Sequence, residues 1–134
     1  FAMTEKVAEY SMKPGDHGST YGGNPFACMA VKTVLDIFEK DQIIAHVNEI
    51  APYLEKCLNE LVENNEFVTA RKGTGLMQGL VLTKPAGEVV KNAIAEGLLI
   101  VVAEGNVIRL LPPLIVEKEQ IDEMIIKLKK ALEK

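Results

Sequence analysis

The sequence predicts an α+β fold, in which a mostly antiparallel sheet has helices packed on one of its faces. Apolar residues recur every three or four positions over residues 25–64 and 117–132, the spacing of amphipathic helices. Two pairs of short, closely spaced stretches read as strands, so each pair is expected to run antiparallel. Together the elements follow the order ααββαββα, which is typical of α+β domains.

The first 24 residues are predicted to be rich in loops. Thr4 can cap a short helical turn, and residues 14–24 then hold four glycines. Asn24 is a favoured helix N-cap and proline is favoured at the first helical position, so a helix is expected over Pro25–Lys40. The sequence places its one organisational boundary at Asn24, between this loop-rich start and the remainder.

The second long helix is expected to follow an N-cap at Asp41 and to reach about Asn64. Pro52 interrupts it and lacks a backbone N–H, which predicts a kink. Two hairpins and two helices complete the chain. The predicted elements are a strand over 67–72, a turn over 73–75, a strand over 76–82, a helix from Lys84 to Glu96, strands over 99–103 and 107–111, and a helix over 117–132.

Charge and composition exclude several classes of function. The 134 residues are 48% hydrophobic, which suits a single core, and 15 basic residues face 19 acidic ones for a net charge of −4. Proteins that bind a phosphate backbone usually gather lysine and arginine on one face. Here the lysines cluster only at the end of the last helix, where the helix dipole favours them, so nucleic-acid binding is not expected.

The two cysteines predict neither a disulfide framework nor a metal site. Cys28 and Cys57 stand alone without a Cys-x-x-Cys pair, so both are expected to be small buried residues in a reducing compartment. Met77 and Met124 are likewise expected in the core. No apolar run approaches the roughly 20 residues of a membrane span, and no signal-peptide pattern is present, which predicts a cytoplasmic protein. The apolar start, Phe1-Ala2-Met3, is read as a cut strand end.

Two groups of residues could bind anions. Glycine-rich loops let backbone amides converge, and Ser19 and Thr20 add hydroxyl donors, so residues 14–25 could hold a phosphate or could be only a connecting loop. Arg109 lies in a predicted strand that stops at two prolines. Its planar guanidinium suits a carboxylate, although an arginine on the solvent face of a strand fits the same pattern.

Three stretches together resemble a known family. Gly15-Asp16-His17-Gly18-Ser19-Thr20-Tyr21-Gly22-Gly23-Asn24-Pro25, Lys72-Gly73-Thr74-Gly75-Leu76-Met77-Gln78-Gly79-Leu80 and Val107-Ile108-Arg109-Leu110-Leu111-Pro112-Pro113-Leu114 are similar, in that order, to segments of the class III, pyridoxal-phosphate-dependent aminotransferases. The likeness covers nearly the whole chain. It is strongest to the members that act on acetylornithine or ornithine, and it implies the small C-terminal domain of a fold-type-I enzyme.

The resemblance implies a role for each candidate residue. Thr20, with Ser19 before it, matches residues that hold the cofactor phosphate of the neighbouring subunit, and Arg109 matches the arginine that binds the substrate α-carboxylate. Residues 1–24 would belong to the large domain and 25–134 to the small domain. The parent enzyme would be a homodimer that uses pyridoxal phosphate to move an amino group between amino-acid and 2-oxoacid substrates.

The resemblance also implies what the chain lacks. No catalytic residue is expected in it, because the lysine that forms a Schiff base with the cofactor would precede Phe1, so the chain alone is expected to be inactive. No metal-binding residue is expected either, as the isolated cysteines already indicate. Acetylornithine, ornithine and succinyl-diaminopimelate remain open as amino donors. A free-standing module that binds a small carboxylate or a partner protein without catalysis is the alternative from a different class.

Overall fold

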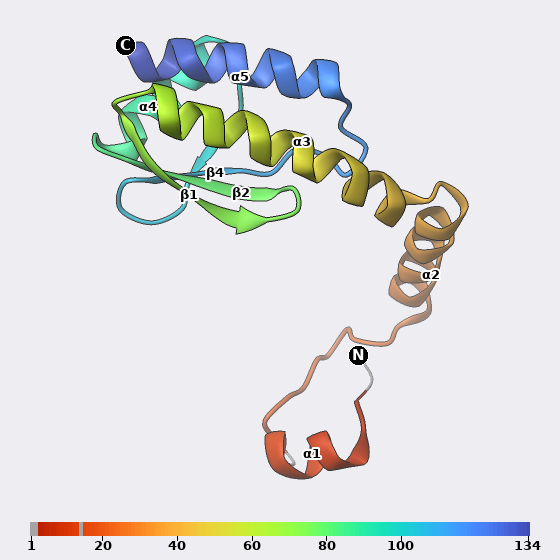
Figure 1. Cartoon of the computed structure of the whole chain (residues 1–134). Coiled ribbons are helices and arrows are strands. Elements are labelled where there is room, and N and C mark those ends of the chain that lie inside the picture. Colours follow the sequence, from red (N-terminus) through yellow and green to blue (C-terminus); the bar gives the residue numbers. More distant parts are fainter. Residues whose placement is uncertain (1–2, 14) are drawn as a thin grey trace. The chain divides into compact units, whose positions relative to one another are not determined.

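A computed structural model describes residues 3–13 and 15–134 of the chain, which divides into two units (Figure 1). The first unit ends at Lys40 and the second comprises Asp41–Lys134. The cut strand end predicted at Phe1-Ala2 and the start of the predicted loop at Pro14 lie outside the described residues. The division into domains at Asn24 stays a prediction, because it concerns a larger protein.

The first unit contains two helices joined by the glycine-containing loop. Helix α1 covers Glu5–Ser11, and the Thr4 hydroxyl caps it by accepting a hydrogen bond from the backbone N–H of Val7. Helix α2 covers Pro25–Lys40, where the Oδ1 atom of Asn24 accepts from the backbone N–H of Ala27 at 2.9 Å. Both predicted helix starts are confirmed, because these side chains satisfy donors that a helix leaves without an internal partner.

The second unit is built on a four-stranded antiparallel sheet with strand order β1-β2-β4-β3. Strands β1 and β2 form one hairpin, and β3 and β4 form the other. Helices α3, α4 and α5 lie on one side of this sheet (Figure 1), which confirms the predicted α+β class. The elements are α3 Ile43–Asn64, β1 Val68–Thr74, β2 Met77–Leu82, α4 Ala86–Ala95, β3 Val101–Val102, β4 Val107–Leu110 and α5 Lys118–Glu133.

The core lies between the sheet and these three helices. Alternate residues of a strand point to opposite faces, and the buried ones, such as Leu80 and Ile108, face the helices. Leu54 and Leu58 of α3 and Leu128 of α5 are fully buried against them. Each such side chain stabilises the fold by about 1.5–3 kcal/mol when it leaves water. The apolar positions that recur along the sequence are therefore the ones that form the core.

Most predicted boundaries differ from the structure by one or two residues, and three differences concern a cap, a turn and a strand length. Asp41 does not cap α3; Gln42 occupies that position in a left-handed conformation with φ of 52°. The first hairpin turns at Gly75-Leu76 instead of over 73–75, since Gly73 still pairs with Gln78. Strand β3 is shorter than predicted, with two residues. Helix α3 runs without interruption through Pro52.

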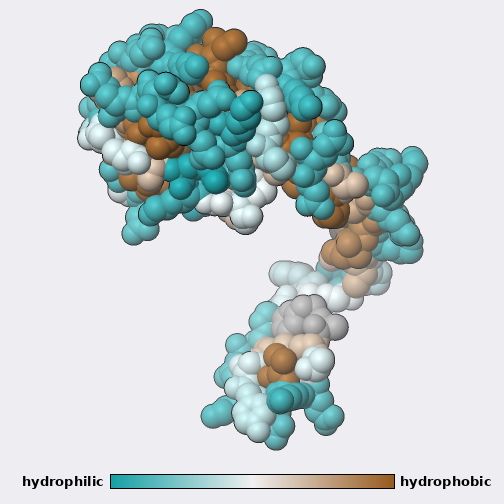
Figure 2. All heavy atoms as spheres, in the orientation of Figure 1, coloured by the Kyte–Doolittle hydropathy of each residue, from teal (hydrophilic) through white to brown (hydrophobic). Residues whose placement is uncertain are grey.

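Two burial predictions were wrong. Cys28 is exposed and Cys57 is half-buried, and both are free thiols. No residue of α2 is buried and most of its large apolar residues are exposed; Figure 2 shows hydrophobic surface along that helix. Met77 is 55% exposed because it lies at the start of β2 on the side of the sheet away from the helices, whereas Met124 is buried as predicted. Among the described residues, no helix combines the length and apolarity of a membrane span.

Candidate functional site

The candidate site lies on the face of the sheet opposite the three helices, which we call the open face. Residues that pair directly across antiparallel strands project to the same side. Lys72 pairs with Gly79, Gly79 pairs with Arg109, and Arg109 pairs with Val101, so the four form one row across the sheet. A hollow of about 170 Å³ opens over this row. Its lining residues are Lys72, Gly73, Met77, Gln78, Gly79, Ala103, Val107 and Arg109.

Strand β4 presents Arg109 to solvent. Its neighbours Ile108 and Leu110 are buried on the helix side, so the alternation of the strand directs Arg109 to the open face. The Arg109 side chain makes no hydrogen bond or ion pair with a described residue. A guanidinium stays charged at physiological pH and offers two parallel N–H groups to a carboxylate. Arg109 is therefore available for an external anion.

Gly79 forms the floor of the hollow beside Arg109. A Cβ atom there would lie 3.4 Å from the Cγ1 atom of Val107 and 3.5 Å from the carbonyl oxygen of Ile108. Those are ordinary contact distances, so the strand could pack with a larger residue. The absence of a side chain instead leaves the backbone of β2 open to a molecule lying between Lys72 and Arg109.

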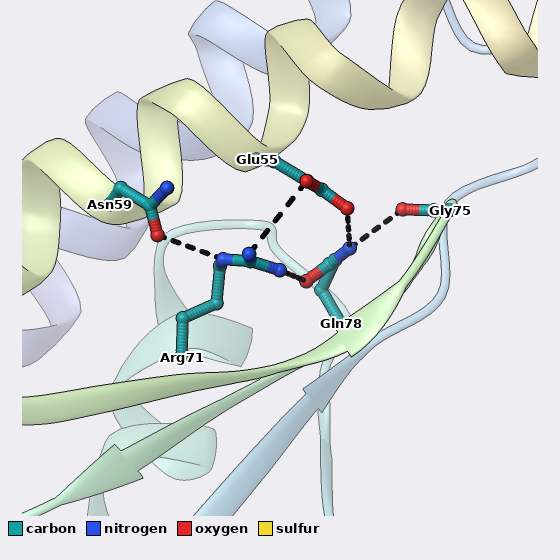
Figure 3. A network of polar contacts seen from close by, with 5 residues as sticks. All are labelled: Glu55, Asn59, Arg71, Gly75 and Gln78. Carbon is teal, nitrogen blue, oxygen red and sulfur yellow. Dashed lines mark hydrogen bonds and ion pairs between the residues drawn. The ribbon is translucent and has the colours of Figure 1, made fainter.

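A polar network on the helix side of the sheet holds the hairpin that carries Lys72 and Gly79 (Figure 3). Arg71 donates from Nε to the Oδ1 atom of Asn59 at 2.8 Å and from Nη1 to the Oε1 atom of Gln78 at 2.7 Å. Gln78 is buried, and its Nε2 donates to the carbonyl oxygen of Gly75 at 2.7 Å. The side chains of Arg71 and Gln78 also approach Glu55 at 3.7 Å and 3.4 Å. Since Asn59 and Glu55 belong to α3, the network ties the hairpin to that helix.

Sequence reasoning missed this network, although a signal for it was present. Alternate residues of β2 are buried, so Gln78 lies on the same side of the strand as Leu80 and Leu82, which face the core. A glutamine at a buried position needs hydrogen-bond partners, because a buried amide without them is costly. The phase of Gln78 therefore indicates a polar contact under the hairpin.

The second predicted site, at Ser19 and Thr20, lies in the loop between α1 and α2. Both side chains are exposed and make no hydrogen bond with a described residue. The loop is shaped by its own contacts: Asp16 accepts a hydrogen bond from the backbone N–H of Lys13 at 2.7 Å, and Asn24 donates to the carbonyl oxygen of Tyr21 at 2.5 Å. These bonds leave the two hydroxyls available to a ligand.

The two predicted sites belong to different units. Ser19 and Thr20 are neighbours in the first unit, and Arg109 shares its hollow with Lys72 in the second. Among the described residues, no group of three or more histidine, cysteine and acidic side chains is placed to hold a metal ion. The arrangement on the open face can bind an anion, and it contains no pair of groups suited to proton transfer.

Each pKa shift found among the described residues lies away from the open face. A hydrogen bond from the Tyr53 hydroxyl to Asp122 raises the pKa of Tyr53, and burial raises the pKa of the Cys57 thiol. A hydrogen bond from the Lys134 ammonium lowers the pKa of the Glu96 carboxyl. The Tyr53–Asp122 and Glu96–Lys134 contacts join different helices, and Cys57 lies beside Tyr53 in α3, so these shifts reflect packing of the helical layer.

Comparisons with known proteins agree on one family. Residues 1–132 match the class-III aminotransferases. Acetylornithine aminotransferase of Gloeobacter violaceus is 44% identical over an alignment of 126 residues, which covers 92% of this chain and 32% of that protein. Ornithine aminotransferase 1 of Staphylococcus saprophyticus is 34% identical over 92% of this chain and 31% of that protein.

A solved structure shows the same fold. The crystal structure of acetylornithine aminotransferase from Elizabethkingia anophelis matches with a TM-score of 0.78 and 28% identity, covering 90% of this chain and 33% of that chain. The chain thus spans about a third of the length of the curated relatives it matches.

Proposed function

The chain belongs to the class-III aminotransferase family, and from that premise we propose that it is the C-terminal part of a pyridoxal-phosphate-dependent aminotransferase. The proposed reaction moves the terminal amino group of N-acetylornithine to 2-oxoglutarate, a step of arginine biosynthesis. The observation that carries the proposal is that the Arg109 side chain is exposed on the open face and makes no ion pair with a described residue. In a cytoplasmic homodimer, residues 1–24 would complete the large domain and 25–134 would form the small domain.

Arg109 would bind the α-carboxylate of each substrate. Two parallel N–H groups hold a carboxylate in a fixed orientation, and each charge-assisted bond contributes about 1.5–3 kcal/mol. The buried neighbours of Arg109 anchor β4 in the core, so the strand holds the guanidinium in a defined place. The role of Arg109 in this proposal is to position the substrate and not to transfer protons.

The loop before α2 fits the phosphate group of the cofactor. Ser19 and Thr20 offer free hydroxyls, and the N-terminus of the 16-residue helix α2 follows shortly after them, where the helix dipole favours an anion. These residues would hold the phosphate at the active site of the neighbouring subunit. When bound, pyridoxal phosphate supplies the electron sink for amino-group transfer. The Schiff-base lysine would lie in the large domain, so the chain alone would be inactive.

Kinetics of the full-length enzyme test the proposal. Arg109→Gln is expected to raise the KM for N-acetylornithine and for 2-oxoglutarate by roughly 10- to 100-fold, because charge-assisted bonds to the carboxylate are lost. Lys91→Gln, which removes an exposed charge from α4, is the matched control and should leave KM unchanged. Unchanged KM values for Arg109→Gln, or transamination by the 134-residue chain alone, would contradict the proposal.

Two alternatives remain within reach of the same assay. The ornithine aminotransferase of Staphylococcus saprophyticus is also a relative, so ornithine is a rival donor, as is succinyl-diaminopimelate. A comparison of kcat/KM for the three donors in the full-length enzyme identifies the preferred one. If none is converted, a non-catalytic module that binds carboxylates or a partner protein becomes the better reading.

A further inference from the structure

Gln78 lies beside the point where β2 supports Arg109. In the pairing of β2 with β4, Gly79 lies opposite Arg109 and Gln78 lies opposite Leu110. Gly79 has no side chain, so it cannot hold the strand in place from the open face. A side-chain tether for this part of β2 can come from Gln78, which is buried on the side of the sheet that the helices cover.

The side chain of Gln78 is fully engaged on that covered side (Figure 3). Its Nε2 atom donates to the carbonyl oxygen of Gly75 at 2.7 Å and to the Oε1 atom of Glu55 at 3.4 Å. Its Oε1 atom accepts from Arg71, which also donates to Asn59 of α3. Because both donors of the amide are used there, Gln78 has none left for a ligand in the hollow. Any effect of Gln78 on binding therefore acts through the position of β2.

Apolar burial does not explain a glutamine at this position. Among the described residues, Gln78 is the only polar one that is buried, and Leu80 and Leu82 share its side of β2. A shift of β2 by two residues would keep these leucines on the same face. It would also carry Gln78 about 7 Å from its partners, beyond hydrogen-bond reach. The directional bonds of Gln78 thus fix where β2 lies along α3, which apolar contacts alone do not.

A second pair of bonds passes the position of β2 on to β4. The backbone N–H of Leu82 donates to the carbonyl oxygen of Asn106 at 2.9 Å, and the Nδ2 atom of Asn106 donates to the carbonyl oxygen of Leu82. Asn106 directly precedes β4, so β4 cannot slide along β2 without breaking both bonds. The place of Arg109 therefore depends on where β2 lies.

We propose that Gln78 is a positioning residue, which holds β2 so that Arg109 meets the substrate carboxylate with two parallel N–H groups. The inference rests on the proposed function, in which Arg109 binds that carboxylate. Bidentate binding needs a defined orientation of the guanidinium, and a misplacement of about 1 Å weakens such contacts strongly. Gln78 thereby raises substrate affinity without contacting the substrate.

Kinetics of the full-length enzyme test this role, at a temperature well below the Tm of every variant. Gln78→Leu is expected to raise the KM for N-acetylornithine and 2-oxoglutarate by roughly 3- to 10-fold, with kcat changed by less than about twofold. Leu132→Ala is the matched control for lost stability. Leu132 is fully buried near the end of α5, which packs mainly against α3 and α4. This control should lower Tm at least as much as Gln78→Leu and leave KM unchanged.

Two variants of Asn59 test the tether from its other end. Asn59→Leu removes the acceptor of the Arg71 Nε–H group, whereas Asn59→Asp keeps an acceptor oxygen. Asn59 is exposed on α3 and is not one of the residues that line the hollow. We expect Asn59→Leu to raise KM by roughly two- to threefold and Asn59→Asp to leave it unchanged. This pair decides the question if Gln78→Leu does not fold.

The outcomes separate this inference from the proposed function. If Arg109→Gln raises KM but Gln78→Leu does not, the role of Gln78 is wrong and that of Arg109 stands. If Leu132→Ala raises KM as much as Gln78→Leu, or if both Asn59 variants change KM by the same factor, the effect is one of general stability and the inference fails. If Arg109→Gln leaves KM unchanged, the proposed role of Arg109 fails and this inference fails with it.

Discussion

Gly73 is expected to be the glycine of the first hairpin that tolerates substitution least. Its φ is +117°, a conformation that L side chains rarely adopt, and a Cβ atom there would lie 2.2 Å from the carbonyl oxygen of Met77. The backbone strain alone costs about 1–3 kcal/mol. The overlap with Met77 must also be relieved by moving the paired strand, since Gly73 lies opposite Gln78. We therefore expect Gly73→Ala to lower the free energy of unfolding by about 2–4 kcal/mol.

Urea unfolding followed by circular dichroism measures this change, with extrapolation to water. Gly87→Ala is the matched control, because Gly87 lies in helix α4 without a positive φ and a Cβ there would meet nothing within 4 Å. The control should gain up to about 1 kcal/mol, since alanine favours a helix over glycine. A Gly73→Ala variant within about 0.5 kcal/mol of the unmodified protein would refute the reasoning about the hairpin.

Two further substitutions test how the layers are joined. Gln78→Leu should lower the free energy of unfolding, measured by urea unfolding, by about 1–3 kcal/mol, because it leaves Arg71 without its buried acceptor. An unchanged free energy of unfolding would mean that the network does not stabilise the fold. In the folded protein, the Lys134 ammonium holds the pKa of Glu96 below its ordinary value. The pair therefore stabilises the fold fully at pH values above the ordinary carboxyl pKa. This stabilisation is lost as the pH falls through the lowered pKa of Glu96. Glu96→Gln should therefore lower Tm at pH 7, and this loss of Tm should shrink as the pH is taken below the ordinary carboxyl pKa. A loss that is the same at every pH would contradict the assignment.

Local sequence signals were sufficient to predict most of the fold. The start of helix α2 at Pro25 was predictable because asparagine favours the N-cap and proline favours the first helical position, and both signals lie next to each other in the sequence. The start of α3 was missed because a left-handed Gln42 carries no such signal; glutamine is not a residue that favours this conformation. Burial of Cys28 was mispredicted for a different reason: periodicity shows that a helix has an apolar side but not what covers it.

The candidate site was only partly predictable. The phase of Arg109 in its strand follows from the apolar residues around it, and the structure places the side chain on the open face. Lys72 could not be linked to it from sequence, because the strand order β1-β2-β4-β3 decides which residues share a row. The roles of Arg109, Ser19 and Thr20 stay predictions.

The register of the first hairpin connects its stability to the hollow on the open face. In β1, Arg71 faces α3 and Lys72 faces the hollow. In β2, the side chain of Gln78 lies on the side of α3 and Gly79 lies at the hollow. A shift of one residue in either strand would exchange the two faces, bringing a lysine toward the core and removing the arginine from its partners. Because the bonds of Arg71 and Gln78 can form only in the observed register, the network on the covered side fixes which residues line the hollow on the other. The buried polar contacts thus act as the constraint that keeps Lys72 and Gly79 in line with Arg109.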